Sequence, residues 1–313
     1  MKKYEKIIDT VLFLGIFFIL LSFASYLFIP KNNLEEFGME QVTANGVLGE
    51  KENTIDILFL GDSEVYTSII PMELFQSHGI TSYVCGTSGQ RLYDSYKFLD
   101  AALKYQNPKL VVLETNAIYR GYTPMSAIQA KIKLLFPAIK YHDRWKHLSV
   151  NDFGGDINYT WTDDNKGYIK KDQIAPSPNP DYMVEEKGYK NISPLNYHQV
   201  AKIKELCEEK GIKFMLMSSP SSKNWNYKKH NGIERLASDL NVEFIDLNLI
   251  DEIDIDWNVD TLDKGDHINY TGALKVSKYM GEYLNNLNIF ENHFDDPNFS
   301  DWKKALDNYK KRA

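Results

Sequence analysis

A long apolar run lies near the start of the chain. Between Thr10 and Ile29, twenty consecutive residues carry no charged side chain. An α-helix of that length spans about 30 Å, the thickness of the hydrocarbon core of a bilayer. A secretory signal has a shorter apolar core, of about 7 to 15 residues, and a small-residue cleavage site. Tyr26 to Pro30 offers poor small-residue spacing. The run therefore favours an uncleaved transmembrane anchor over a cleaved signal.

After a polar stretch, short apolar runs alternate with amphipathic segments. Residues 31–53 are polar and poorly periodic, which predicts a linker. The apolar runs beyond them predict strands, and apolar residues at helical spacing predict helices. We expect strands at 55–60, 82–85, 110–113, 213–217 and 242–245, and helices at 92–105, 200–209, 233–240 and 271–286, the last with Thr271 as N-cap. This alternation predicts an α/β fold with a central parallel sheet covered on both faces. Ligands of such sheets bind beyond the carboxyl ends of the strands.

An aromatic-rich stretch interrupts the alternation at 119–193. It holds Trp145, Trp161 and many tyrosines, and it is too long for a plain connection. We therefore expect an inserted subdomain or lid. The predicted organisation is a cytoplasmic tip and anchor at 1–30, a linker at 31–53, a main domain at 54–290 that contains the insertion, and a helical tail at 291–313.

The composition is that of an ordinary globular protein, with 43% hydrophobic and 25% charged residues. A net charge of −7 argues against nucleic-acid binding and against a broad anionic-lipid footprint, since both need a basic face. The chain has two cysteines, Cys85 and Cys207, which allow at most one disulfide and exclude a paired-thiolate zinc motif. The sequence does not decide whether these two cysteines pair. Because Lys2, Lys3 and Lys6 precede the apolar run, the positive-inside rule places the N-terminus in the cytoplasm and the main domain outside.

Polar residues follow each of the first three predicted strands. The first strand ends in Gly61-Asp62-Ser63-Glu64. A serine at a turn from strand into helix can present its Oγ to the crevice, where backbone N–H groups face a developing oxyanion. Gly89, after the second strand, allows close backbone approach. Asn116, after the third, has an amide that can donate to an oxyanion. Taken alone, Gly61-Asp62-Ser63 and Gly89 are each more typical of an ordinary turn, and Asn116 could simply bind the local backbone.

His267 precedes the last predicted helix and has Asp263 and Asp266 nearby. An imidazole can act as a general base when a carboxylate holds its tautomer and stabilises the cation that forms. Adjacent residues of an extended segment point in opposite directions, so Asp266 needs a turn, which Gly265 allows. Asp263 has the longer reach but needs a looped approach. Both stay candidates, with a preference for Asp266 because it adjoins the core of the motif.

In this order, the four signals resemble the sequence blocks of the SGNH/GDSL hydrolase superfamily. Gly61-Asp62-Ser63 matches the first block, Gly89 the second, Asn116 the third and His267 the fifth. The resemblance covers residues 55–118 and 196–286. It implies a flavodoxin-like three-layer sandwich with a central parallel sheet. It also implies Ser63 as nucleophile, His267 as base, and an oxyanion hole formed by Ser63, Gly89 and Asn116.

Two positions depart from the family pattern. Lys264 stands three residues before His267, where the family commonly has its triad Asp. In the third block, Glu114 and Ala117 replace the usual neighbours of Asn116. The first departure leaves the identity of the triad acid open, and the second alters the support of the oxyanion Asn.

The resemblance implies acyl transfer through a serine ester, without a metal or a cofactor. The single anchor at 10–29 is similar to that of the extracytoplasmic SGNH partners of membrane-bound O-acyltransferases, which O-acetylate polysaccharides or help to D-alanylate teichoic acids. We therefore expect a membrane-anchored O-acyltransferase that uses an acyl ester and a cell-envelope or exported polysaccharide, with a membrane-bound O-acyltransferase as candidate partner. The alternatives are a tethered carbohydrate or lipid esterase or deacetylase, and a non-catalytic glycan-binding subunit. Aromatic faces stack on sugar rings, and the candidate substrate contacts are Gln90, His142, Trp145 and Trp161.

Overall fold

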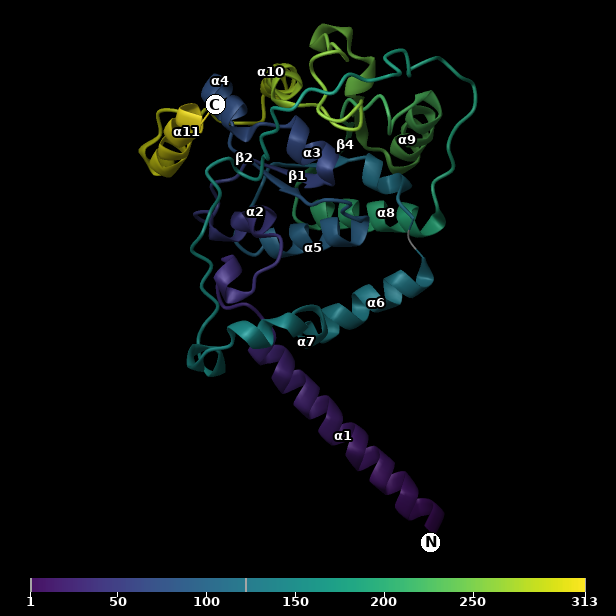
Figure 1. Ribbon diagram of the computed structural model, residues 1–313, viewed down its shortest axis with the longest axis vertical. Helices are drawn as coiled ribbons and strands as arrows, with labels where there is room; N and C mark the ends of the chain where they lie inside the picture. The colour runs from purple at the N-terminus through teal and green to yellow at the C-terminus, as the bar shows by residue number, and fades with distance from the viewer. Residues whose placement is uncertain (1, 122, 313) are drawn as a thin grey trace. The chain divides into compact units, whose positions relative to one another are not determined.

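The computed structural model describes residues 2–121 and 123–312, which form two compact units (Figure 1). Unit 1 comprises Met1–Val42 and Thr123–Trp161, and unit 2 comprises Thr43–Tyr122 and Thr162–Ala313. Residues 1, 122 and 313, which fall in the predicted anchor tip, insertion and tail, lie outside the described residues.

Unit 2 is built on a five-stranded parallel sheet with the strand order β2-β1-β3-β4-β5. The residues of the three strands β1, β2 and β3 are all buried, which explains their unbroken apolar runs. This order is the flavodoxin-like one. The predicted α/β fold with a central parallel sheet is therefore confirmed. The strands are β1 (Ile57–Gly61), β2 (Ser82–Gly86), β3 (Leu110–Glu114), β4 (Lys213–Ser218) and β5 (Glu243–Asp246).

Helices cover both faces of the sheet (Figure 1). One face carries a cluster of α3 (Ser63–Ser68), α4 (Pro71–His78) and α10 (Tyr270–Asn286), and the other carries α5 (Leu92–Ala102) and α8 (Pro194–Glu209). Two further helices pack at the side of these layers: α9 (Tyr227–Leu240) lies against β5, and α11 (Ser300–Arg312) lies against α4.

The start of α10 differs from the prediction. Asn269 is the N-cap, and its Oδ1 accepts a hydrogen bond from the Gly272 N–H at 3.3 Å. Thr271 lies inside the helix, and its hydroxyl donates to Asp260 and to Asn269. The prediction of Thr271 as N-cap is wrong, because the amide oxygen of Asn269 already accepts from the Gly272 N–H of the first turn.

Residues 31–53 are folded and are not a plain linker. Their second half belongs to unit 2, where Ala44 and Val47 are each 1% exposed. Glu50 forms a buried ion pair with Lys166 at 2.8 Å. The linker prediction is therefore wrong, because the few apolar residues here sit in short turns that have no regular period. These turns are η1 (Glu35–Phe37), α2 (Val42–Asn45) and η2 (Gly46–Gly49).

The predicted insertion at 119–193 is divided between the two units. Residues 123–161 belong to unit 1, and residues from 162 onward belong to unit 2. In unit 2, the Val84 N–H donates to the Lys166 carbonyl at 2.9 Å. The segment around Lys166 therefore lies beside β2, an outer strand of the sheet. It pairs a strand edge that would otherwise leave backbone groups free.

Unit 1 combines the N-terminal helix with the segment 123–161. Helix α1 is long and apolar enough to cross a membrane over Tyr4–Phe28. Arg144, only 2% exposed, pairs with Asp152 and donates to the carbonyls of Leu27 and Phe37, both at 2.6 Å. The end of α1 is therefore part of a folded unit. Besides η1, its elements are α1 (Lys2–Phe28), α6 (Pro124–Leu135), α7 (Pro137–Lys140), η4 (His142–His147) and η5 (Val150–Phe153).

The tail at 291–313 is largely helical, with η8 (Pro297–Phe299) before α11. Trp302 of α11 is 2% exposed and packs on Phe75 of α4, with 5.5 Å between ring centroids. Cys85 and Cys207 are both buried free thiols. The remaining short turns are η3 (Asn116–Tyr119), η6 (Leu247–Leu249) and η7 (Asp251–Ile253).

Candidate active site

Ser63 stands where β1 passes into α3. Asp62 is the N-cap of α3, and its Oδ1 accepts a hydrogen bond from the Glu64 N–H at 3.1 Å. Packing requires the glycine before it, since a Cβ at Gly61 would lie 2.6 Å from the Cβ of Glu114. Ser63 is thus the first residue of a helix, at the carboxyl end of an inner strand, and is 8% exposed.

His267 connects Ser63 to a carboxylate. Its Nε2 lies 2.7 Å from Ser63 Oγ, and its Nδ1 lies 2.7 Å from Asp263 Oδ2. The second oxygen of Asp263 accepts a hydrogen bond from the His267 backbone N–H at 2.7 Å. The structure therefore brings together a carboxylate, an imidazole and a hydroxyl in one hydrogen-bonded chain.

A tight turn allows Asp263 to face the imidazole. Lys264 and Gly265 both adopt left-handed conformations, with φ of 64° and 87°. The Gly265 N–H donates to Thr261 Oγ1 at 2.8 Å, and a Cβ at Gly265 would lie 1.9 Å from Ser222 Oγ. The chain therefore loops back over four residues, which is the looped approach that Asp263 requires.

Asp266 does not hold the imidazole in this arrangement. Its Oδ1 lies 3.8 Å from His267 Nδ1, beyond hydrogen-bond distance. Its carboxylate instead accepts hydrogen bonds from Lys223 and Asn224. Burial opposes its ionisation, but the hydrogen bond from Lys223 and the charge of His267 outweigh this effect and lower the pKa of Asp266. The sequence-based preference for Asp266 over Asp263 is therefore wrong, because a left-handed turn reverses the direction of the chain.

A buried glutamate lies beside these groups. Glu64 is 1% exposed, and its Oε1 accepts a hydrogen bond from Asn224 at 2.7 Å. Its Oε2 has no hydrogen-bond partner among the described residues. Burial, followed by the charges of Asp62 and Glu114, raises the pKa of Glu64 well above its ordinary value. The surroundings of Glu64 thus favour a neutral carboxylic acid.

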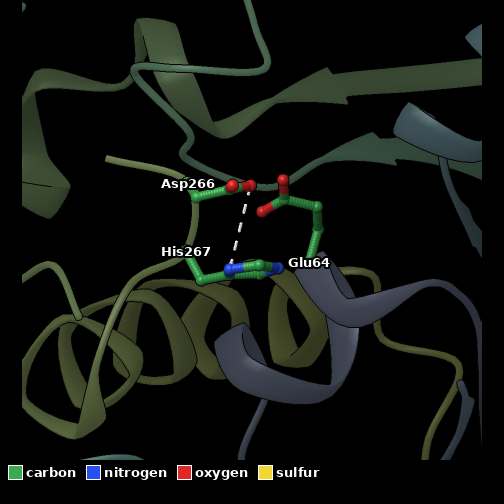
Figure 2. Close-up of side chains that lie close together, drawn as sticks. All are labelled: Glu64, Asp266 and His267. Carbon is green, nitrogen blue, oxygen red and sulfur yellow. Dashed lines mark ion pairs between the residues drawn. The ribbon is translucent and has the colours of Figure 1, made fainter. Parts of the chain in front are cut away.

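Glu64, Asp266 and His267 also form a group with converging ligand atoms. Figure 2 shows the two carboxyl groups side by side next to the imidazole, and one ligand atom from each residue lies within 4.8 Å of the others. The two imidazole nitrogens already have partners: Nε2 contacts Ser63 and Nδ1 contacts Asp263. A metal ion that used His267 here would have to replace one of these two contacts.

Asn116 begins the turn after β3 and is held from two sides. Its Nδ2 donates to Asp62 Oδ2 at 3.1 Å, and Lys229 Nζ lies 3.5 Å from its Oδ1. Arg120 donates to the same Asp62 oxygen, so this fully buried carboxylate is paired. A carboxamide nitrogen has two hydrogens. The second N–H of the Asn116 amide has no acceptor among the described residues.

Glu114 and Lys229 are titratable residues that lie next to Asn116. Glu114, 1% exposed, accepts a hydrogen bond from the Asn116 backbone N–H at 2.9 Å. Burial, followed by the charge of Asp62, raises the pKa of Glu114 well above its ordinary value. Burial lowers the pKa of Lys229, whereas the charges of Glu114 and Glu64 oppose this shift. Glu114, the departure in the third block, therefore holds the backbone of Asn116.

The loop after β2 presents Gly89 in a left-handed conformation, with φ of 63°. Neither the Gly89 N–H nor the Ser63 N–H donates to another described residue. Gln90 is 2% exposed, and its amide donates to the Cys85 carbonyl at 3.1 Å and to Ser95 Oγ at 3.0 Å. The expected substrate contact of Gln90 is therefore not supported, because its side chain is buried and supports the loop.

The other three candidate substrate contacts belong to unit 1. The His142 side chain is 73% exposed and Trp145 is 64% exposed. Trp161 exchanges hydrogen bonds with Asn33 through its backbone N–H, at 3.0 Å, and its carbonyl, at 2.6 Å. Their role in substrate binding stays a prediction.

The sequence reasoning missed the residues that follow β4. Lys223 and Asn224 come from the polar stretch after this strand, and both bind Asp266. The rule that ligands bind beyond the carboxyl ends of parallel strands also applies to β4 and could have found these two residues.

Tyr66 gave no such signal in the sequence. Burial raises the pKa of Tyr66, and hydrogen bonds with the Ser88 and Ser63 side chains partly oppose this shift. The Tyr66 phenol therefore also lies near Ser63.

No family model and no curated protein matches the chain. Several solved structures are similar to it. A psychrotrophic esterase from Pseudoalteromonas sp. is 12% identical over 74% of this chain and 97% of its own, with a TM-score of 0.40. An acetyl xylan esterase is 17% identical over 74% and 100%, with a TM-score of 0.39. A lipase/acylhydrolase from Enterococcus faecalis is 10% identical over 74% and 97%, with a TM-score of 0.38. At these values, function has to be argued from the site itself.

Proposed function

We propose that this protein is a serine esterase or acyltransferase of the SGNH/GDSL superfamily. The observation that carries the proposal is the hydrogen-bonded chain from Asp263 through His267 to Ser63, at the carboxyl edge of the sheet. These three groups, in these contacts, are the set that activates a serine for acyl transfer.

The first step forms a bond between Ser63 Oγ and the acyl carbon of an ester. His267 Nε2 accepts the hydroxyl proton at the distance of 2.7 Å, while the carbonyl electron pair moves to the acyl oxygen. Asp263 accepts the Nδ1–H, so that Nε2 carries the free electron pair, and it stabilises the imidazolium that forms.

The resulting oxyanion needs donors at a fixed position. The backbone N–H groups of Ser63 and Gly89 and the free N–H of Asn116 supply them, since no other described residue uses them. Asp62, held in turn by Arg120, fixes the orientation of the Asn116 amide.

Collapse of the intermediate breaks the bond to the leaving alcohol, which takes the proton from His267. The acyl group then stays on Ser63 as an ester. An acceptor hydroxyl then loses its proton to His267 and attacks the acyl carbon. The bond between Ser63 Oγ and the acyl carbon breaks, and Oγ takes the proton back from His267. The acceptor is water in hydrolysis or a sugar hydroxyl in transfer. Exclusion of water decides between these outcomes.

We further propose that α1 anchors the enzyme in the cell membrane. The N-terminus of the chain then lies in the cytoplasm, and unit 2 lies outside the membrane. The packing of unit 1 supports a retained anchor. Arg144 donates to the Leu27 carbonyl, and the Ala138 N–H donates to Ser25 Oγ. Cleavage after a signal sequence would remove these acceptors from a folded unit.

Within this proposal, the acceptor is a cell-envelope or exported polysaccharide, and the transferred group is an acetyl or related acyl group. The resemblance to the extracytoplasmic partners of membrane-bound O-acyltransferases supports this choice, and such an enzyme is the proposed partner. The exposed Trp145 and the half-buried Trp161 suit stacking on sugar rings.

Labelling with a fluorophosphonate tests the catalytic part. We expect the label on Ser63, with loss in Ser63→Ala and strong slowing in His267→Ala. Ser88→Ala is the control, because Ser88 is an exposed serine on the neighbouring loop and its loss should leave the label in place. A folded wild-type protein that takes no label contradicts the proposal and favours a non-catalytic glycan-binding subunit.

Product partition separates transfer from hydrolysis. An acyl-ester donor is turned over with and without polysaccharide, and free acid and acylated acceptor are both measured. A transferase shifts product toward the acceptor as the polysaccharide concentration rises. Hydrolysis that no acceptor changes contradicts transfer and favours a tethered esterase or deacetylase.

A further inference from the structure

An apolar stripe runs along one side of α6 in unit 1. Its four residues in α6 follow one another at intervals of three and four, so they share one helical face. A stripe of this kind usually faces a protein core, but no residue of α6 is buried. We define the α6–α7 stripe as these residues together with one residue of α7: Met125 (63% exposed), Ile128 (52%), Ile132 (40%), Leu135 (70%) and Ile139 (39%).

The stripe adjoins the apolar helix α1. Phe136, directly after α6, stacks on Phe18 of α1 with 5.9 Å between ring centroids. The Ala138 N–H donates to Ser25 Oγ at 3.3 Å. Helix α7 therefore packs on α1. Figure 1 shows α6 extending away from the end of α1 on which α7 packs. The stripe and α1 form one apolar surface that the described residues leave largely uncovered.

These contacts extend from the middle of the apolar run of α1 to its outer end. In a run from Thr10 to Ile29, Phe18 lies near the middle and Ser25 near the outer end. At a rise of about 1.5 Å per residue, half of this run spans about 15 Å, the hydrocarbon thickness of one leaflet. A segment that packs on this half of α1 lies at the depth of the outer leaflet.

The segment is basic although the whole chain has a net charge of −7. Residues 123–148 contain five Lys and Arg and a single acidic residue, Asp143. In α6, Lys131 and Lys133 are exposed. Basic amphipathic helices bind anionic membrane interfaces. The basic charge favours lipid over a second copy of this acidic chain.

We propose that the α6–α7 stripe is immersed in the outer leaflet of the membrane that α1 crosses, with Lys131 and Lys133 at anionic headgroups. This inference rests on the anchored location given under the proposed function. It adds a second membrane contact beside α1. Two contacts, at different positions, hold unit 1 at a set depth and restrict its rotation about α1.

Fluorescence quenching in the full-length protein tests this placement. Leu135→Cys and Leu134→Cys form a matched pair, because both leucines are exposed but only Leu135 lies on the stripe. Each variant is labelled with a fluorophore and reconstituted in vesicles that contain anionic lipid. The native thiols, Cys85 and Cys207, are buried, which limits background labelling. We expect a lipid-borne nitroxide to quench the probe at 135 severalfold more than the probe at 134, and aqueous iodide to show the reverse order.

A third probe, Phe17→Cys in α1, separates this inference from the anchor itself. Lipid quenching at 17 with equal quenching at 134 and 135 overturns the stripe proposal and leaves the anchor intact. Shielding of 135 from both quenchers shows a protein occupant and also overturns it. No lipid quenching at 17 overturns the anchor and the stripe together, while labelling of Ser63 reports on catalysis separately. Quenching at 135 should weaken in vesicles without anionic lipid, and equal quenching overturns the headgroup contact.

Discussion

At the scale of single residues, His267 lies between two carboxylates that have different partners. Asp263 accepts the Nδ1–H at 2.7 Å, whereas Asp266 binds Lys223 and Asn224. Loss of the carboxylate that fixes the imidazole tautomer lowers kcat about 10⁴-fold in a comparable triad. We therefore expect Asp263→Asn to lower kcat for a soluble ester about 10³- to 10⁴-fold, and Asp266→Asn to lower it only slightly. Steady-state kinetics of the two matched variants check this, and the opposite ranking would contradict the assignment.

Glu64 makes the stability of the fold depend on pH. Because burial raises its pKa above the ordinary value of 4.5, the folded protein binds this proton more tightly than the unfolded chain. The resulting stabilisation is complete below the unfolded pKa and is lost as pH rises through the folded pKa. Glu64→Gln keeps the shape and cannot ionise, so the wild type should lose stability relative to the variant as the pH rises from the ordinary value of 4.5 toward the folded pKa. Urea midpoints of both proteins across this range measure the effect, and parallel curves would rule it out.

Some site residues could be predicted from the sequence because their signals are local. Ser63 and His267 each stand in a short motif beside a strand or a helix. The contact of Asp263 depends on a left-handed conformation at Lys264, a residue type that rarely adopts it. No period or composition signals such a turn, so the sequence left two candidate acids.

At the scale of elements, the strands were predicted more closely than the helices. The run at 55–60 appears as β1 at Ile57–Gly61, because a strand buried on both faces is an unbroken apolar run. Helix α8 begins at Pro194, with Ser193 as N-cap, although the apolar period predicts a start at 200. Its first six residues contain a single aliphatic side chain, Leu195, so they show no apolar period.

Arg144 in η4 connects α1 to the rest of unit 1. Arg144→Met leaves the buried Asp152 without its partner and the carbonyls of Leu27 and Phe37 without this donor. Removal of one partner from a buried ion pair costs about 3–5 kcal/mol. We therefore expect faster limited proteolysis within residues 123–161 in detergent.

Lys146→Met is the matched control for this variant. Lys146 lies in the same short helix, but its ion pair with Asp143 is exposed, so its loss should change little. Equal protease resistance of the Arg144 and Lys146 variants would contradict a structural role for Arg144.

At the scale of the whole molecule, the candidate chemistry and the candidate anchor belong to different units. Ser63, His267 and Asp263 lie in unit 2, whereas α1 and the α6–α7 stripe lie in unit 1. The sequence suggests a single insertion at 119–193 because that stretch is aromatic and irregular throughout. Its division depends on long-range contacts, such as the hydrogen bond from Val84 to Lys166, which no local pattern reveals.

Trapping the covalent intermediate tests the central claim most directly. The wild-type protein is quenched in acid during turnover of an acetyl ester, and the acetyl group is located by peptide mass spectrometry. The account predicts acetylation of Ser63 in the wild type and none in Ser63→Ala or His267→Ala. An acetyl group on another residue, or ester turnover that persists unchanged in Ser63→Ala, would contradict it.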